Sequence, residues 1–534
     1  MNQNKPRAII AAGHTQTAEA AAEVIAAGGN AFDGAVAALA TACVAEPVLA
    51  SLGGGGFLHA RPAAGAPLIY DFFTQTPRVK ASTQALDFYP IQVDFGDTVQ
   101  EFHIGMGSIA TPGVIAGLFR VQNELCRLSP ARLLEPARRL AERGVVVNSF
   151  QHRIAAIVEP ILRANPRVFA LHASARDPQR LADVGECLRQ PESADALSQL
   201  ATQGPGLLYG QAMHGSHGQA SNNAANGCSA IGLWGEQLVA DSVAQGGHLS
   251  VADLAGYTVE LREPLIGDYR GAKLYLNPPP SLGGLLIRLT LDLLSRQRIE
   301  GLHFGSAAHR HLLATAMHLT QELRTATQAD DTGFDPRLLA QYRSLMHDTK
   351  LFRRGTTQIS IADTDGNLAS LTLSNGEGAG YLLPGTGIVM NNMLGEEDLN
   401  PTGFHQWITN RRIGSMMCPT LVQHVDGGWS VLGSSGSNRI RSAILQVLSN
   451  LIDLHMPLAE AVDAARIHYE NGLLNLEPPC DNQVIEALQS RWPNILAWSG
   501  PSVFFGGAHA VAIAADGSLS GAGDGRRGGV VRRV

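Results

Sequence analysis

Apolar and polar residues alternate most regularly in the C-terminal third of the chain. The segment 356–363 places isoleucines between polar neighbours, which is the period of a half-buried strand. Asp365-Gly366 is typical of a turn, and 368–375 then alternates in the same way. The pattern predicts a β-hairpin. Further strands are predicted at 420–425, 428–433 and 509–516.

The N-terminal region favours helices. Residues 17–27 form an alanine-rich run that ends at Gly28-Gly29, and glycine accepts the left-handed conformation of a helix C-cap. Asn30, followed three residues later by Asp33, predicts the capped start of a second helix that runs to Pro47. Other mainly helical regions are predicted at 114–185, 284–350 and 441–466, with loops around a surface insertion at 201–230.

Four consecutive glycines occupy 53–56. A glycine-rich loop that binds nucleotide phosphates follows a strand and opens a helix. Here the glycines follow a predicted helix and precede a predicted strand. Close packing of the backbone is the better explanation.

Composition narrows the class of protein. The chain has 534 residues, 45 % hydrophobic and 16 % charged, with a net charge of −7. We therefore expect either a large compact assembly or several domains, and a protein that binds neither nucleic acid nor a membrane. The N-terminus lacks the apolar core of a signal peptide, which predicts a cytoplasmic protein. Six scattered cysteines indicate neither zinc nor a disulfide framework. Arg526, Arg527, Arg532 and Arg533 indicate a solvated tail or salt bridges.

Thr356 has no distinguishing feature by itself, since threonine is common in strands. The order of motifs along the chain changes this. It resembles the γ-glutamyltranspeptidase family over almost the whole length. The matching segments are 21–47, GGGGF at 53–57, ATPGVIAGL, AERGVVVN, LREPLIGDYRG, NPPPSLGGLL, GTTQISIADTDGNLASLT, PGTGIVMNNML, SMMCPTLV and GSSGSNRIRSAILQVLSN.

The resemblance implies an α+β fold, the four-layer αββα sandwich of the N-terminal-nucleophile hydrolases. It also implies that the precursor cuts itself between Gly355 and Thr356. The products are a large subunit of residues 1–355 and a small subunit of residues 356–534, together one globular unit. The resemblance implies no cofactor and no metal, and it leaves a dimer of the processed pair open.

Cleavage supplies what a threonine nucleophile needs. A hydroxyl is a poor nucleophile at neutral pH unless a base lies beside it. Cutting before Thr356 uncovers an α-amino group, with a pKa near ~8, on the same residue. The family pattern implies that Ser374 hydrogen-bonds this amine. It also implies that the backbone N–H groups of Gly436 and Ser437 form the oxyanion hole.

The resemblance also assigns substrate contacts. Glu396 takes the position of an acidic residue that binds the substrate's α-amino group. Ser415 and Met416 take the positions of a serine pair that binds the α-carboxylate. Asn375 lies one residue before a polar position of the family and is expected to substitute for it after a local shift.

Several family residues are replaced, all in the expected substrate pocket. The family has an arginine that grips the α-carboxylate, and here that position is Phe73. Met416 replaces the second serine, Gln358 a histidine, and Met393 an amide side chain. An unpaired carboxylate against Phe73 is costly unless Arg78, Arg411 or Arg412 supplies the charge.

These observations predict an autoprocessed amide hydrolase or acyltransferase that works through an acyl-Thr356 ester. Its substrates are small-molecule amides, either γ-glutamyl compounds of glutathione metabolism or a related amide. One alternative is an acylase for apolar acyl groups, as in the cephalosporin-acylase-like branch, and another is an inert binding member. GSSGS is not a G-x-S-x-G elbow, which excludes a serine α/β-hydrolase.

Overall fold

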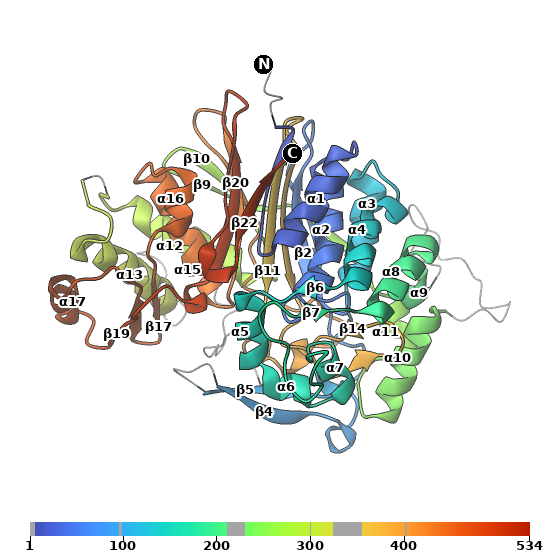
Figure 1. The fold of residues 1–534 in the computed structure, drawn as a ribbon. Helices are drawn as coiled ribbons and strands as arrows, with labels where there is room; N and C mark the ends of the chain where they lie inside the picture. Colours follow the sequence, from blue (N-terminus) through green and yellow to red (C-terminus); the bar gives the residue numbers. More distant parts are fainter. Residues whose placement is uncertain (1–5, 95–98, 211–229, 300, 324–354, 401–402) are drawn as a thin grey trace.

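Two antiparallel sheets face each other in the middle of the molecule (Figure 1). The computed structural model describes all residues except 1–5, 95–98, 211–229, 300, 324–354 and 401–402. The seven-stranded sheet has the order β22 (Val530–Arg533), β1 (Ala8–Ala12), β11 (Thr357–Asp363), β12 (Leu368–Ser374), β2 (Gly55–Arg61), β3 (Leu68–Phe72), β8 (Glu260–Arg262). The six-stranded sheet has the order β21 (Leu519–Ala522), β20 (Gly507–Ile513), β16 (Trp429–Ser435), β15 (Thr420–Gln423), β10 (Ala272–Leu276), β9 (Leu265–Tyr269).

Helices cover the outer face of each sheet (Figure 1). The seven-stranded sheet is covered by α1 (Thr15–Ala26), α2 (Ala31–Ala45) and α3 (Val114–Leu125), with α4 (Pro130–Arg143) packed beyond them. The six-stranded sheet is covered by α12 (Leu282–Ser295), α15 (Arg439–Ile452) and α16 (Leu458–Asp463), with α13 (Ala307–Glu322) beyond α12. The predicted αββα sandwich is confirmed.

Smaller elements surround the sandwich. The helices are α5 (Ser149–Ile157), α6 (Glu159–Arg163), α7 (Pro166–Ala170), α8 (Pro191–Gln203), α9 (Gly206–Tyr209), α10 (Leu233–Ala244), α11 (Val251–Ala255) and α17 (Asn482–Gln489). The strand groups are β4 (Tyr89–Asp94) with β5 (Val99–Ile104), β6 (Val145–Val146) with β7 (Cys187–Leu188), β13 (Leu382–Leu383) with β14 (Ile388–Val389), and β17 (Ile467–Glu470) with β18 (Leu473–Leu476) and β19 (Ile495–Ala497).

The predicted helices are mostly found where the sequence places them. Asn30 caps α2 through a capping box with Asp33, as predicted. The region 114–185 is helical only as far as Ala170, and the remainder is irregular apart from one β-bridge. Most of the predicted insertion at 201–230 and the end of the predicted helical region 284–350 lie outside the described residues. No helix in the described part is long and apolar enough to cross a membrane.

The hairpin of β11 and β12 is confirmed, but its burial differs from the prediction. Ile359 and Ile361 face the helix layer, as expected for the apolar side of the strand. The polar side, expected to face water, is buried against the second sheet, where Ser360 Oγ donates to the carbonyl of His509 at 2.9 Å. The period of two is the same whether polar residues meet solvent or polar groups of a facing sheet.

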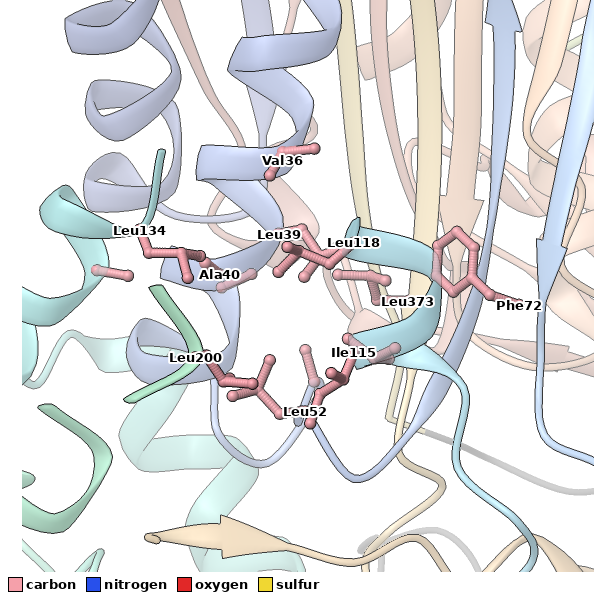
Figure 2. Packing of buried hydrophobic residues seen from close by; sticks show 14 of the residues in the cluster. Val36, Leu39, Ala40, Leu52, Phe72, Ile115, Leu118, Leu134, Leu200 and Leu373 are labelled. Carbon is pink, nitrogen blue, oxygen red and sulfur yellow. The ribbon is translucent and has the colours of Figure 1, made fainter. Parts of the chain in front are cut away.

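The largest core lies between the seven-stranded sheet and its helices. Figure 2 shows Leu39 and Ala40 of α2 between Leu134 of α4 and Leu118 of α3, with Phe72 at the sheet side. Small residues let these elements come close: a Cβ on Gly117 of α3 would lie 2.2 Å from Cγ of Phe72. The glycine run serves close packing, as predicted, because a Cβ on Gly54 would lie 2.5 Å from the carbonyl oxygen of Ser374.

Candidate active site

Thr356 lies immediately before β11, an inner strand of the seven-stranded sheet, and is only 2 % exposed. Strand pairing brings Ser374 alongside it, because Thr357 pairs with Leu373 in the β11–β12 ladder. The sequence-predicted nucleophile and its predicted partner therefore occupy neighbouring ends of adjacent strands.

Two hydrogen bonds hold Gly355, the residue before the predicted nucleophile. Ser374 Oγ donates to the carbonyl oxygen of Gly355 at 2.7 Å. The backbone N–H of Gly355 donates to Oε1 of Glu377 at 2.6 Å. In the intact chain, Ser374 thus contacts the carbonyl of the bond that is predicted to break. A hydroxyl in this position withdraws charge from the carbonyl carbon and favours attack on it.

Glu377 was not among the residues that the sequence singled out. Its own backbone N–H donates to Oδ1 of Asn392 at 2.9 Å, which fixes the turn after β12. The one available signal was that Glu377 is the single charged residue in the stretch SNGEGAGY. A lone carboxylate among glycines is equally common on a solvated turn, so only the three-dimensional structure identifies its contact with Gly355.

Glu46 is a second buried carboxyl that the sequence reasoning missed. It accepts hydrogen bonds from Thr17 Oγ1 at 2.8 Å and from Thr357 Oγ1 at 2.7 Å. Burial raises the pKa of Glu46 to about 7, and the two hydroxyl donors partly oppose this rise. The carboxyl group of Glu46, whose pKa is near neutrality, therefore contacts Thr357, the residue that follows Thr356.

His509 of β20 lies next to this carboxyl. A Cβ on Gly13 would be 2.9 Å from Oε2 of Glu46 and 3.4 Å from Nε2 of His509, so both atoms converge on the same small residue. His509 Nδ1 accepts a hydrogen bond from the backbone N–H of Asp524. Burial lowers the pKa of His509 to about 4, which keeps the ring neutral near pH 7.

Gly436 and Ser437, the predicted oxyanion hole, form the turn between β16 and α15. Both residues have positive φ, 113° and 55°, which is rare for serine. Their carbonyls accept hydrogen bonds from Arg439 and Ile440, so the turn leads directly into the helix N-terminus. The left-handed turn and the helix dipole both favour an anion at this place.

A cavity lies beside Gly355. It is lined by Leu49, Arg153, Ile154, Ile157, Val158, Gly355, Glu377, Arg439, Trp498, Ser502, Val503, Phe504 and Arg527. Gly355 and the first residue of α15 therefore share one cavity.

The prediction of a solvated tail is wrong for Arg527, which is buried in the wall of this cavity. Burial lowers its pKa to about 10, and Glu377 and Asp524 oppose this effect. Arg526 makes the predicted salt bridge, 2.6 Å to Glu477.

Three of the four residues at replaced family positions are part of one large hydrophobic core. Phe73, Met393 and Met416 all belong to it, and Phe73 is fully buried. The ring of Phe73 stacks on that of Phe57 with centroids 5.4 Å apart. The three replacements therefore contribute to the buried hydrophobic core, whereas the fourth, Gln358, does not.

Arg412 has a structural role here. Its guanidinium lies 3.4 Å from Asp71 and donates to the carbonyl of Phe73, to that of Thr258 and to the hydroxyl of Tyr257. Arg78 donates Nε to the carbonyl of Ala252 on the surface, and Arg411 is exposed. The guanidinium of Arg412 is therefore engaged by groups of the segments 71–73 and 257–258 rather than turned to a ligand.

Glu396 lies against the turn after β12. A Cβ on Gly376 would be 2.7 Å from Oε1 of Glu396, so this carboxylate reaches the residues that follow Ser374. In the same turn, Oδ1 of Asn375 is buried and makes no hydrogen bond within the described chain.

Ser415 and Gln358 are engaged in the local structure. Ser415 Oγ accepts from the backbone N–H of Met417 at 3.1 Å. Gln358 accepts from Thr372 Oγ1 and donates to Ser360 and Ser370, so its amide links polar residues between the sheets. The substrate roles of Ser415, Glu396 and Asn375 stay predictions.

Comparison with known proteins assigns the chain to a family. The model of the γ-glutamyltranspeptidase family matches residues 17–534. The acylase ACY 1 proenzyme of Pseudomonas sp. (strain SE83) is 31 % identical over 97 % of this chain and 91 % of that protein. The glutathione hydrolase proenzyme of Pseudomonas aeruginosa is 29 % identical over 86 % of this chain and 82 % of that protein.

Solved structures with the same architecture include an acylase. Cephalosporin acylase from Bacillus halodurans superposes with a TM-score of 0.80 at 22 % identity, covering 99 % of this chain and 96 % of that one. At this identity the similarity concerns the fold, which is that of the N-terminal-nucleophile hydrolases. The family match over residues 17–534 and the 31 % identity to the acylase proenzyme establish that the chain is an enzyme of the γ-glutamyltranspeptidase family.

Proposed function

We propose that the chain is an autoprocessed amide hydrolase or acyltransferase in which Thr356 is the nucleophile. Self-cleavage yields a large subunit, 1–355, and a small subunit, 356–534. The observation that carries this proposal is the hydrogen bond from Ser374 Oγ to the carbonyl oxygen of Gly355 at 2.7 Å. Both relatives named above are called proenzymes, which agrees with a precursor that is processed.

Cleavage follows from the contacts of Gly355. Thr356 Oγ attacks the carbonyl carbon of Gly355, and its proton passes to the departing nitrogen of Thr356. The C–N bond breaks and an ester joins Gly355 to Thr356 Oγ. Negative charge develops on the carbonyl oxygen, where Ser374 donates its hydrogen bond. Water then hydrolyses the ester and leaves a carboxylate on Gly355 and a free hydroxyl on Thr356.

Turnover repeats the same attack on an external amide. The new α-amino group of Thr356 takes the hydroxyl proton, directly or through water, as the oxygen attacks. The backbone N–H groups of Gly436 and Ser437 stabilise the oxyanion, and the amine of the substrate departs with the proton. Water or a second amine then attacks the acyl-Thr356 ester and releases the acyl group.

The acyl group is either γ-glutamyl or less polar. The apolar side chains of Phe73, Met393 and Met416 favour an acylase, since these residues stand where the family binds charged groups. An acylase and a glutathione hydrolase both occur among the relatives. A series of p-nitroanilides with γ-glutamyl, aliphatic and aromatic acyl groups separates the two. Release of nitroaniline from γ-glutamyl alone would exclude the acylase.

The nucleophile is tested by the state of the purified protein. We expect two bands on a denaturing gel, with Thr356 as the N-terminal residue of the smaller one. The variant Thr356→Ala should remain one band of 56.5 kDa and release no nitroaniline, because it lacks the attacking oxygen. If Thr356→Ala still divides, the nucleophile is another residue. A wild-type protein that stays whole and inactive would instead indicate an inert binding member of the family.

A further inference from the structure

The cavity beside Gly355 carries an excess of positive charge. Among the described residues that line it, three are arginines, Arg153 from α5, Arg439 from the start of α15 and Arg527 near the C-terminus, and one is a carboxylate, Glu377. Glu377 is already engaged by the backbone N–H of Gly355. Asp524, the other carboxylate near Arg527, pairs with Arg466 at 2.7 Å and with Arg526 at 3.1 Å. The cavity is therefore suited to an anion.

Arg527 is the central residue of this wall. It is 6 % exposed, and its Nη2 donates to the carbonyl of Val503 at 3.1 Å. Its Nε is buried and has no hydrogen-bond partner within the described chain. A Cβ on Gly436 would lie 3.3 Å from Nη2 of Arg527, so the guanidinium reaches the turn predicted as the oxyanion hole. A buried donor without an acceptor is costly, and a bound carboxylate would supply the acceptor.

The remaining walls are apolar. Arg439 donates Nε to the carbonyl of Phe504 and lies 5.0 Å above its ring. The ring of Trp498 stacks on the same Phe504 ring, with the two centroids 4.8 Å apart. Ile154 and Ile157 contribute aliphatic surface. Arginine forks at one side and apolar walls at the other suit a carboxylate carried on a short hydrocarbon body.

We propose that the cavity lined by Arg153, Arg439, Arg527 and Gly355 is a carboxylate-binding site. This inference rests on the proposed function in one respect: the site adjoins the carbonyl that Thr356 attacks. It places the carboxylate-binding charge of the enzyme away from position 73, where phenylalanine stands. The carboxylate has two possible sources. One is the substrate, and the other is the new C-terminus that self-cleavage creates on Gly355.

Calorimetric titration with glutarate, and with its neutral analogue glutaramide, tests the site without any need for turnover. The first protein is the full-length Thr356→Ala chain, which carries no carboxylate at Gly355. We expect glutarate to bind at least tenfold more tightly than glutaramide. Equal binding of the two compounds, or no binding of glutarate, overturns the proposal.

Arginine variants in the Thr356→Ala background locate the charge. Arg527→Met should raise the dissociation constant of glutarate at least tenfold, and Arg527→Lys should restore part of the affinity. Since Arg527 is buried, the exposed Arg153→Ala provides a variant whose folding is not at risk, and it should weaken binding about threefold or more. Arg176→Ala, which removes an arginine 86 % exposed on its side chain and outside the cavity, is the matched control. If Arg153→Ala and Arg527→Met both bind glutarate like the parent, the site is elsewhere.

The processed wild-type protein distinguishes the two sources. If it binds glutarate as Thr356→Ala does, and glutarate inhibits turnover competitively, the site receives a carboxylate of the substrate. If only the uncleaved variant binds glutarate, the carboxylate of Gly355 occupies the site after cleavage. Failure of the wild type to divide or turn over any amide would refute the proposed function and leave the titration result intact.

Discussion

Gly355 is held through both polar atoms of its backbone, by Ser374 at the carbonyl and by Glu377 at the N–H. These contacts fix the carbonyl carbon next to Thr356 before any bond is broken. A reaction between groups already in contact avoids the entropic cost of bringing them together. The geometry of this one residue therefore links the fold to self-cleavage.

Ser374→Ala should slow the appearance of the small subunit about 10- to 100-fold, because the carbonyl oxygen loses a hydrogen-bond donor as its negative charge develops. The rate is measured by following the precursor band on denaturing gels after expression is stopped. Ser374→Thr keeps the hydroxyl and serves as the control. Cleavage of Ser374→Ala at the wild-type rate would show that the 2.7 Å hydrogen bond has no part in the reaction.

Glu46 makes stability depend on pH. Burial raises the pKa of Glu46 from 4.5 to about 7, so the folded protein holds this proton more tightly than the unfolded chain does. The protonated carboxyl of Glu46 therefore contributes its full share to the free energy of unfolding below about pH 4.5. This contribution falls as pH rises and is lost above about pH 7. Between pH 4.5 and pH 7 the free energy of unfolding is expected to fall by roughly 3 kcal/mol from this group.

Glu46→Gln should flatten this dependence, since glutamine does not titrate. Thermal unfolding of the Thr356→Ala precursor, with and without Glu46→Gln, is followed between pH 5 and pH 8. We expect the variant to lose less stability than its parent over this interval, and the exposed Glu236→Gln to behave like the parent. An identical pH dependence with glutamine at position 46 would mean that Glu46 is already ionised at pH 5.

Sequence reasoning reached some of these residues and missed others for a physical reason. Thr356, Ser374 and the 436–437 turn belong to local motifs that a sequence displays. The sequence around Glu46, Glu377 and Arg527 contains no local motif that indicates a role for these three side chains. Their importance arises from contacts between distant segments, such as Thr357 with Glu46 across 311 positions. Such contacts leave no local pattern to read.

At the scale of single elements, β11 shows what a pattern does and does not determine. The alternation correctly predicted a strand and placed Ile359 and Ile361 on one face. It did not reveal that the other face meets a second sheet, because serine and glutamine suit water and a hydrogen-bonded interior alike. The capping box of α2 was predictable because it is made of residues three positions apart.

Helix α3 packs on β3 through a glycine, and this contact tolerates no side chain. A Cβ on Gly117 would lie 2.2 Å from Cγ of Phe72, whose ring is fully buried. Gly117→Ala should therefore destabilise the protein by about 1–3 kcal/mol, despite the better helix propensity of alanine. Denaturant unfolding of the Thr356→Ala precursor measures the change.

Gly206→Ala is the matched control for that helix contact, because a Cβ there meets nothing within 4 Å. It should unfold at the same denaturant concentration as the parent. If Gly117→Ala also unfolds like the parent, then α3 shifts away from Phe72 at little cost.

Across the whole molecule, the two predicted subunits are interleaved. The seven-stranded sheet joins β1 to both β22 and β11, and β12 to β2, so strands from 1–355 and from 356–534 pair at three places in this sheet. The six-stranded sheet joins β15 to β10 in the same way. Four strand ladders therefore connect the two parts in addition to their apolar cores.

The cleaved subunits should consequently elute together in gel filtration under native conditions and separate only in denaturant. Each ladder is a row of backbone hydrogen bonds, so separation would break all four rows at once and leave their donors and acceptors unpaired. The uncleaved Thr356→Ala protein provides the reference elution volume. Two separate native peaks would contradict the interleaved arrangement.

The interleaving also sets an order of events in the life of the molecule. As one chain, the strands of both parts meet at the high effective concentration that a covalent tether provides. After the cut, the same assembly would have to form by collision of two separate polypeptides. Under the proposed cleavage, the peptide bond before Thr356 therefore assists folding only once. A processed molecule that unfolds is lost, so its lifetime depends on how slowly it opens rather than on how readily it refolds.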